Sequence, residues 1–265
     1  VAISVRAHSR RTLDERESCG GKRYPVQVCE RQSLLYLSVG ERVKSMLVDS
    51  FAAPMYATNC WVIAPKAGSE CVVIDPGMPD VSAMLDEILK KHSLKPVAII
   101  ATHGHLDHTF SIQPIADGYS IPAYIHSLDR MALTHPERYV STEFAATLSA
   151  MDFVEPVDVR ELRNEEVVEL VGMKFKAIHA PGHTAGSLVF VVDDELLVSG
   201  DVLFAGSIGR TDLPGGSAEA METTLRKKIM PLGDHLRVLP GHYAETTMGA
   251  EKKSNPFLTA LKGRY

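Results

Sequence analysis

The stretch Thr102-His103-Gly104-His105-Leu106-Asp107-His108 is the most informative part of this sequence. It follows an apolar run at 97–101, which has the length and composition of a short buried strand. In an extended loop, residues two positions apart project to the same side, so His103 and His105 can bind one metal ion together. Asp107 and His108 lie where the loop turns into a following helix, and they can face a second ion. The pattern predicts a metal site in a loop at the end of a strand.

Three further residues of the same chemistry stand in turns that follow predicted strands. His183 and His242 each end a Pro-Gly-His sequence, and Asp201 ends a Ser-Gly-Asp sequence. Catalytic groups gather in loops that rigid strands hold in place. We therefore expect these turns to meet the histidine-rich loop at one end of the fold.

The predicted metal ligands form two sites that share one carboxylate. They are His103, His105, Asp107, His108, His183, Asp201 and His242. The expected first site is His103, His105 and His183. The remaining residues form the second site, and Asp201 bridges the two ions. Imidazole and carboxylate ligands suit two divalent ions, Zn²⁺ first and Fe²⁺ or Mn²⁺ as alternatives.

Strand-like and helix-like segments alternate from Met46 onward, in two halves. Runs of strands followed by helices predict an α/β (α+β) fold, with two mixed sheets packed face to face inside two helical layers, a four-layer αββα sandwich. Residues 135–160 are expected to be an irregular lid or connecting loop. The expected strands are 46–51, 59–64, 70–74, 97–101, 122–126, 167–170, 173–179, 187–192, 196–199 and 237–239. The expected helices are 79–92, a helix from the histidine cluster to about 117, 127–134, 218–229 and 256–262.

Residues 1–45 differ from the rest of the chain in charge and in pattern. They hold nine Lys/Arg and five Asp/Glu, a net charge of +4 in a chain of net charge -5, and their apolar positions lack periodicity until about Leu34. We expect a disordered N-terminal extension, with Met46, the first methionine, as a candidate natural start. Residues 46–265 are then expected to form one domain that carries the metal site.

Composition excludes several classes of partner. The net charge of -5 argues against nucleic acid. Apolar runs are about a strand long, far below the roughly 20 residues that span a bilayer, and no segment has the order of a secretory signal. Cys60 and Cys71 lie in apolar runs and Cys19 and Cys29 form no CxxC pair, which predicts reduced thiols and a cytoplasmic protein. The sequence leaves the oligomeric state open.

The ligand motif and its neighbours resemble the metallo-β-lactamase superfamily, and within it the glyoxalase II-like branch, the hydroxyacylglutathione hydrolases. The resemblance spans about 46–260 and includes Asp75-Pro76-Gly77, residues 180–184 and Gly200-Asp201. The run 203–212 is similar to small bacterial members. The family fold, an αββα sandwich, agrees with the element order.

The resemblance and metal chemistry together imply a hydrolase for a small-molecule thioester. Two metal ions would hold a bridging hydroxide that attacks the thioester carbonyl. Asp107 is the candidate catalytic residue, since it can orient the nucleophile and accept its proton while it also binds the second metal.

The run Gly209-Arg210-Thr211-Asp212 leaves the substrate open. It replaces the basic and aromatic residues that the branch carries after the bridging aspartate, which puts glutathione specificity in doubt. It also resembles persulfide dioxygenases, which use one iron; here its ligands would be His103, His183 and Asp201. Lactonase and β-lactamase activities are further alternatives.

Other polar residues are expected to support the site or to lie on the surface. Asp75 is expected to fix a loop or a ligand histidine. Arg210 and Asp212 are expected to form an ion pair, with binding of an anionic substrate as the alternative. The remaining histidines are expected at the surface or behind the ligands; they are His8, His92, His126, His135, His179 and His235.

Overall fold

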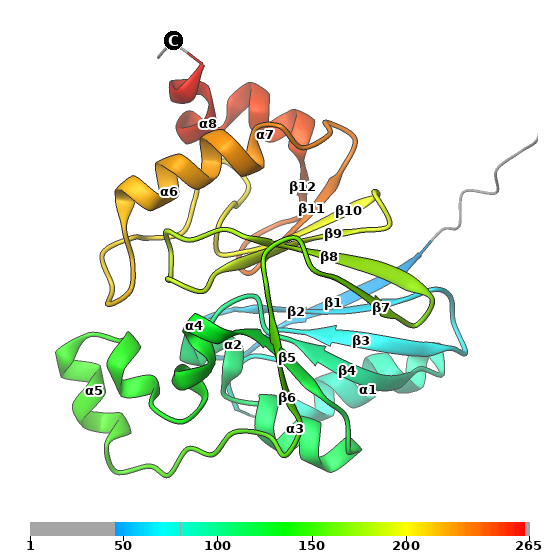
Figure 1. Ribbon diagram of the computed structural model, residues 1–265. Coiled ribbons are helices and arrows are strands. Elements are labelled where there is room, and N and C mark those ends of the chain that lie inside the picture. Colours follow the sequence, from blue (N-terminus) through cyan, green and yellow to red (C-terminus); the bar gives the residue numbers. More distant parts are fainter. Residues whose placement is uncertain (1–45, 80, 263–265) are drawn as a thin grey trace, which may run out of the picture. The chain divides into compact units, whose positions relative to one another are not determined.

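The computed structural model describes residues 46–79 and 81–262, which form two six-stranded mixed sheets with helices on both outer faces (Figure 1). The first sheet contains, in spatial order, β1 (Leu47–Ala52), β2 (Asn59–Ala64), β3 (Glu70–Ile74), β4 (Lys95–Ile100), β5 (Ala123–His126) and β6 (Val159–Leu162). The second contains β12 (Thr246–Thr247), β11 (Arg237–Pro240), β10 (Leu196–Gly200), β9 (Leu188–Val192), β8 (Met173–His179) and β7 (Val167–Leu170). The predicted αββα sandwich is confirmed.

Helices follow the strands of each half. In the first half they are α1 (Ser82–His92), α2 (Leu106–Thr109), α3 (Ile112–Tyr119), α4 (Ser127–Arg130), η1 (Met131–Leu133), η2 (Pro136–Tyr139) and α5 (Thr142–Leu148). In the second they are α6 (Ala218–Thr224), the π-helical turn η3 (Leu225–Ile229), α7 (Met248–Ser254) and α8 (Pro256–Leu261). Among these described helices, none is long and apolar enough to cross a membrane.

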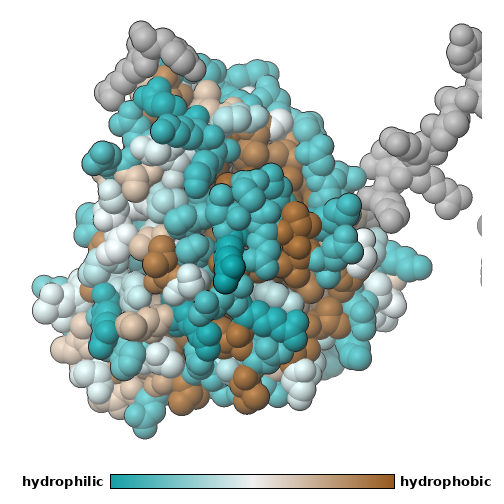
Figure 2. Space-filling view, in the orientation of Figure 1, coloured by the Kyte–Doolittle hydropathy of each residue, from teal (hydrophilic) through white to brown (hydrophobic). Residues whose placement is uncertain are grey.

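Three apolar layers hold the sandwich together. The central one lies between the sheets and includes Ile63, Ile100, Phe175 and Phe190, each at most 1% exposed. A second layer joins the first sheet to α1 and α3, and a third joins the second sheet to α6, α7 and α8. Hydrophilic residues cover most of the α6–α8 layer on the face in Figure 2, as expected for helices that bury one side only.

Strand patterns follow from their positions in the layers. The central strand β9 reads Leu-Val-Phe-Val-Val and is almost wholly buried, because one face meets the other sheet and the other meets helices. The edge strand β7 has exposed residues at alternate positions. Continuous apolar runs therefore indicated inner strands correctly.

The expected irregular segment at 135–160 is partly wrong. It contains η2 and α5, and β6 begins at its end. Helix α5 buries only Leu148, which packs with Met78 and Leu106, so its amphipathic pattern is weak. Strand β12 and helix α7 were also missed, since β12 has two residues and α7 carries a glycine and two lysines. The prediction of disorder at 1–45 lies outside the described residues.

Both sheets bring the ends of parallel strands to the same end of the sandwich. In the first sheet β3 runs parallel to β4, and in the second β10 runs parallel to β11. Backbone bonds join the sheets there: Leu188 N donates to Thr102 O at 2.8 Å, and Asn59 N donates to Gly241 O at 2.7 Å. The segments after β4, β10 and β11 carry six of the seven predicted ligands, and the loop after β8 carries the seventh, His183.

Candidate metal centre

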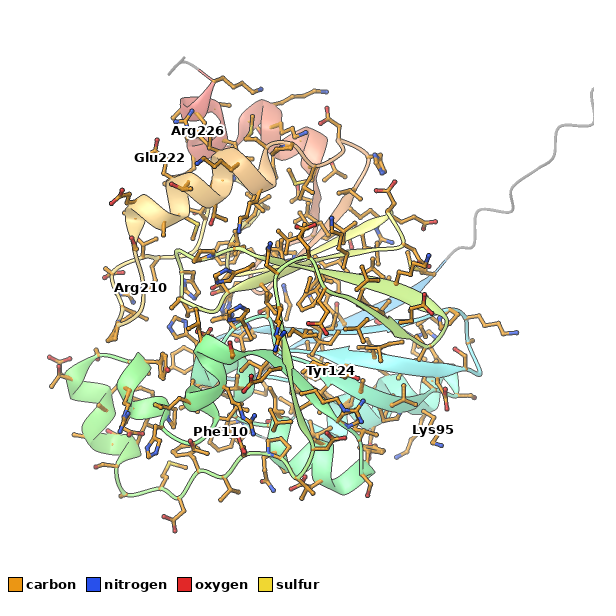
Figure 3. All side chains as sticks on the ribbon, in the orientation of Figure 1. Lys95, Phe110, Tyr124, Arg210, Glu222 and Arg226 are labelled. Carbon is orange, nitrogen blue, oxygen red and sulfur yellow. The ribbon has the colours of Figure 1, made fainter. Side chains whose placement is uncertain are left out.

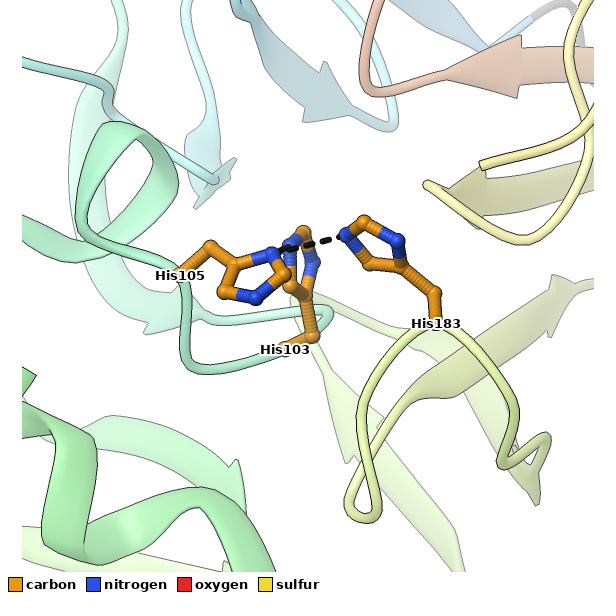
Figure 4. A group of neighbouring side chains, drawn as sticks. All are labelled: His103, His105 and His183. Carbon is orange, nitrogen blue, oxygen red and sulfur yellow. Dashed lines mark hydrogen bonds between the residues drawn. The ribbon is translucent and has the colours of Figure 1, made fainter. Parts of the chain in front are cut away.

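The first group consists of three buried imidazoles from two loops. His103 and His105 follow β4, and His183 follows β8 (Figure 4). Nδ1 of His105 lies 3.2 Å from Nε2 of His103 and 2.8 Å from Nε2 of His183. All three nitrogens lie within 4.8 Å of one another, close enough to bind one ion.

Hydrogen bonds behind two of these rings determine their tautomers. Nδ1 of His183 donates to the carbonyl oxygen of Arg210 at 2.7 Å, because a carbonyl can only accept. Nδ1 of His103 donates to the Thr102 hydroxyl at 3.1 Å, because that hydroxyl already donates to Asp75 at 2.6 Å. In this tautomer, Nε2 of each ring presents a lone pair to the centre of the group.

The second group lies beside the first and combines a carboxylate with two imidazoles. Oδ2 of Asp107 lies 3.2 Å from Nε2 of His242 and 3.5 Å from Nε2 of His108. The two Nε2 atoms are 3.4 Å apart. These three atoms also lie within 4.8 Å of one another.

Asp201, which follows β10, lies between the two groups. Its Oδ2 is 3.5 Å from Nε2 of His183 and 3.5 Å from Nε2 of His242, so one oxygen faces both groups. Its Oδ1 is 3.4 Å from Nε2 of His108 and has no hydrogen-bond partner, although it is buried. This position suits a carboxylate that bridges two ions. The structure thus brings all seven predicted ligands together.

Asp75 supports the ligands from behind. Its Oδ1 accepts the Thr102 N–H at 2.8 Å, and its Oδ2 accepts the Thr102 hydroxyl at 2.6 Å and Nδ1–H of His108 at 2.9 Å. One possible ligand atom from each of Asp75, His103 and His108 also lies within 4.8 Å of the other two. Because these bonds use both oxygens of Asp75, we interpret Asp75 as the orienting residue, as predicted, and not as a ligand.

The donor set fits divalent metal ions. In the first group, two fixed lone pairs and Nδ1 of His105 converge, and a single proton on His105 could satisfy only one of them. In the second group, a carboxylate oxygen faces two ring nitrogens. Buried groups that lack enough protons to pair with one another are stabilised by a cation. Each group thus offers three nitrogen or oxygen ligands, as transition-metal sites do.

The charges in the cluster shift the pKa values in opposite directions. Burial, with the neighbouring His183, lowers the pKa of His105 to about 3. Burial also disfavours the cationic form of His108, but Asp107, Asp201 and Asp75 outweigh it and raise its pKa to about 10. Burial would raise the pKa of Asp107, yet His108 and His242 hold it below its usual range. The cluster therefore favours the ionised form of Asp107 and the positively charged form of His108.

A glycine makes room for the second group. A Cβ atom at Gly241 would lie 2.2 Å from Oδ1 of Asp201 and 2.7 Å from Cε1 of His108. Real Cβ atoms essentially never show contacts this short, so a larger residue at 241 would have to displace one of the two predicted ligands. This explains the glycine of the Pro-Gly-His turn that carries His242.

The cluster lies at the base of an open cavity of about 580 Å³. Its walls are mainly apolar and aromatic, and they include Phe144 of α5, Phe204 and Tyr243. The expected role of 135–160 as a cover therefore holds for η2–α5, whose residues 140, 141 and 144 line the cavity. Arg210 is the one Lys or Arg among the described residues that line it.

Arg210 forms the expected ion pair. Its Nε and Nη2 donate to the two oxygens of Asp212 at 2.8 and 2.7 Å, and both side chains are well exposed. Figure 3 labels Arg210 on the loop between β10 and α6. Exposed pairs contribute little stability, so this contact mainly sets the direction of the guanidinium.

The other described histidines lie outside the two groups. His92 lies 2.7 Å from Asp49, and His135 and His235 are exposed partners of Glu137 and Asp194. His126 and His179, at the ends of β5 and β8, stack with their centroids 4.3 Å apart. His8 lies outside the described residues. Cys60 and Cys71 are buried free thiols, as predicted.

The sequence did not single out two supporting residues. Thr58, fully buried before β2, donates its hydroxyl to Oδ2 of Asp107 at 3.1 Å. Asp129 of α4 is fully buried and contacts both loops of the first group. Neither residue belongs to a spaced motif, and a threonine or an aspartate alone gives no signal for a site.

Known proteins match this chain in sequence over most of its length. The chain is 40% identical over 223 residues to an uncharacterized protein of Mycobacterium tuberculosis strain H37Rv, covering 82% of this chain and 99% of that one. It is 30% identical over 216 residues to the hydroxyacylglutathione hydrolase GloC of Haemophilus influenzae, covering 81% and 99%.

Solved structures of other proteins are also similar to this chain. The BLEG-1 B3 metallo-beta-lactamase has a TM-score of 0.71 and 34% identity, covering 80% of this chain and 100% of that one. The protein TTHA1623, solved in a di-iron-bound form, has a TM-score of 0.65 and 32% identity at the same coverage. The model of the metallo-beta-lactamase superfamily matches residues 53–242, which include all seven predicted ligands. This chain belongs to the metallo-beta-lactamase superfamily.

Proposed function

We propose that this chain is a binuclear metallohydrolase that cleaves 2-hydroxyacyl thioesters of a low-molecular-weight thiol, S-lactoylglutathione among them. The observation that carries the proposal is the pair of adjacent three-residue groups with Asp201 between them. A hydrolase of this kind uses both groups together. The relatives agree in class, since one of them is named a hydroxyacylglutathione hydrolase.

The seven predicted ligands divide between two ion sites. His103, His105 and His183 would hold the first ion, and Asp107, His108 and His242 the second, with Asp201 shared. Bound there, two ions would lower the pKa of a water molecule to about 7 and polarise the carbonyl under attack. Zn²⁺ is our first choice, and the di-iron form of TTHA1623 supports Fe²⁺ as an alternative.

Asp107 is the residue of this chain that would move a proton. Its Oδ2 faces His242 at 3.2 Å and accepts the Thr58 hydroxyl, and its side chain borders the cavity. A carboxylate held in this way can orient a nucleophile and accept its proton. No general acid is required for the leaving group, because a thiolate leaves readily at neutral pH.

The cavity favours recognition of the acyl group over recognition of charges on the thiol. Phe144, Phe204 and Tyr243 supply apolar contact, whereas Arg210 already pairs with Asp212. Two free carboxylates on a thiol such as glutathione would thus meet few cationic partners. We expect turnover to depend more on the acyl group than on the thiol.

Metal content and oxygen uptake test the proposal. Protein purified without added metal should hold two transition-metal ions and hydrolyse hydroxyacyl thioesters without consuming oxygen. His242→Ala should lower turnover about a hundredfold or more, on the scale of losing a major transition-state contact. A persulfide dioxygenase with one iron would not need His242. Oxygen uptake with glutathione persulfide that survives His242→Ala would therefore refute the hydrolase proposal and support the dioxygenase.

A further inference from the structure

Asp129 is a fully buried carboxylate that the seven ligands do not explain. It lies in the short helix α4 and is 0% exposed. Its Oδ2 accepts the Gly104 N–H at 2.8 Å and the Thr184 hydroxyl at 2.6 Å, and its Oδ1 accepts the Gly186 N–H at 2.7 Å. These three bonds use both oxygens of the carboxylate.

The three donors belong to the two loops of the first metal group. Gly104 lies between His103 and His105. Thr184 directly follows His183, and Gly186 comes two residues after Thr184. The loops come from different sheets, and the donors are 25, 55 and 57 residues away from Asp129 in the chain. One carboxylate therefore fixes the separation between the loop of His103 and His105 and the loop of His183.

Close packing leaves this carboxylate little freedom. A Cβ atom at Gly104 would lie 3.1 Å from Cβ of Asp129, and one at Gly186 would lie 2.5 Å from its Oδ1. Both glycines allow the loop backbones to approach the side chain directly. A shift of Asp129 would displace at least one of the loops.

The charge of Asp129 also indicates a cation nearby. Its three donors are two backbone N–H groups and one hydroxyl, and none of them is charged. A buried anion is costly unless a positive charge lies nearby. A cation between His103, His105 and His183 would supply that charge, because the same loops surround it.

We propose that Asp129 is a positioning residue for the first metal ion, which holds the three imidazoles in binding geometry and compensates the charge of the ion. This inference rests on the proposed function only in its metal binding, not in the thioester reaction. Residues that orient metal ligands in this way contribute about 10- to 100-fold to metal affinity.

Asp129→Asn is the informative variant, because asparagine keeps the shape but cannot serve both loops. If its amide nitrogen takes the place of Oδ1, it faces the Gly186 N–H; if it takes the place of Oδ2, it faces the Gly104 N–H. Either way two donors face each other, and one loop loses its bond.

Glu251→Gln is the matched control. Glu251 of α7 is 3% exposed, and it also accepts three bonds from uncharged donors, namely the Thr246 hydroxyl, the Gly206 N–H and the Asn255 amide. It has the same kind of environment as Asp129, but it holds neither loop of the first group. Thermal unfolding of each apo-protein verifies that both variants are folded.

Apo-protein should be titrated with Zn²⁺ in competition with a chromophoric chelator. We expect wild type to bind two equivalents and Asp129→Asn to bind one of them about 10- to 100-fold more weakly, with Glu251→Gln within about threefold of wild type. Wild-type affinity for both equivalents in Asp129→Asn would overturn the proposal, as would an equal loss in Glu251→Gln.

Two further variants keep the test decisive. Thr184→Val removes one of the three donors without changing the shape of the side chain, so it should weaken the same equivalent by a smaller factor if Asp129→Asn does not fold. In a His183→Ala background, which lacks a first-site ligand, the Asp129 change should have little further effect on Zn²⁺ affinity. Additive losses there would show a general structural role instead. All readouts are metal affinities, so absence of thioesterase activity would refute the proposed function and leave this inference standing.

Discussion

Gly241→Ala changes the metal centre by a single methyl group. The new carbon would lie 2.2 Å from Oδ1 of Asp201 and 2.7 Å from Cε1 of His108, so one of these ligands must move. Gly241 has no positive φ, and the cost is therefore steric and not conformational. Overpacking of this kind destabilises a protein by about 1–3 kcal/mol. Where the strain falls on Asp201 itself, the same energy corresponds to a metal affinity lower by about 5- to 150-fold.

Denaturant unfolding of the apo-protein and Zn²⁺ titration against a chelator measure the two parts of this effect. We expect apo Gly241→Ala to lose about 1–3 kcal/mol of unfolding free energy and to bind both ions more weakly, because Asp201 faces both groups. Gly118→Ala in α3 is the control: its Cβ meets nothing within 4 Å, so it should stabilise by about 0.5–1 kcal/mol. Wild-type metal affinity and stability in Gly241→Ala would refute the close packing inferred here.

Two other changes test the bridging carboxylate and the buried thiols. Asp201→Ala should lose tight binding of both ions in elemental analysis, since Oδ2 lies 3.5 Å from one imidazole of each group; two ions retained would exclude the bridge. In a Cys19→Ser/Cys29→Ser background at pH 8, Cys60 and Cys71 should react with a disulfide reagent about a thousandfold more slowly than a free thiol, because burial raises the pKa of Cys71 to about 12 and that of Cys60 well above its usual range. Rapid modification of the folded protein at either thiol would contradict this.

Local pattern was sufficient to predict the inner strands and the residues that gather in the two candidate metal-binding groups. The run Leu-Val-Phe-Val-Val at β9 can be stable only between two covered faces, and the structure buries it there. The histidine motif follows the parallel strand β4, which brings it to the same sheet end as Asp75 after β3. In these cases a short segment contains the physical reason for its own place.

Elements with weak hydrophobic patterns were not predicted, and the reason is again physical. Strand β6 reads Val-Arg-Glu-Leu and buries only Leu162, so its pairing with β5 and not its composition makes it a strand. Helix α5 buries only Leu148 of its own residues and owes its place to packing with Met78 and Leu106 over the cavity. Tertiary contact decides such elements, and intrinsic propensity does not.

The sequence did not indicate the other supporting residues, because nothing in their own segments requires them. Asp75 was identified through its turn after β3, but Thr58 and Asp129 act on partners 25 to 57 residues away. Ligand spacing is local because two or more side chains of one loop must meet one ion. Residues that support the ligands have no required spacing in the sequence, since any element that packs behind the loop can supply an acceptor. A ligand motif therefore predicts the metal chemistry, while the strength of metal binding depends on contacts that only the folded chain brings together.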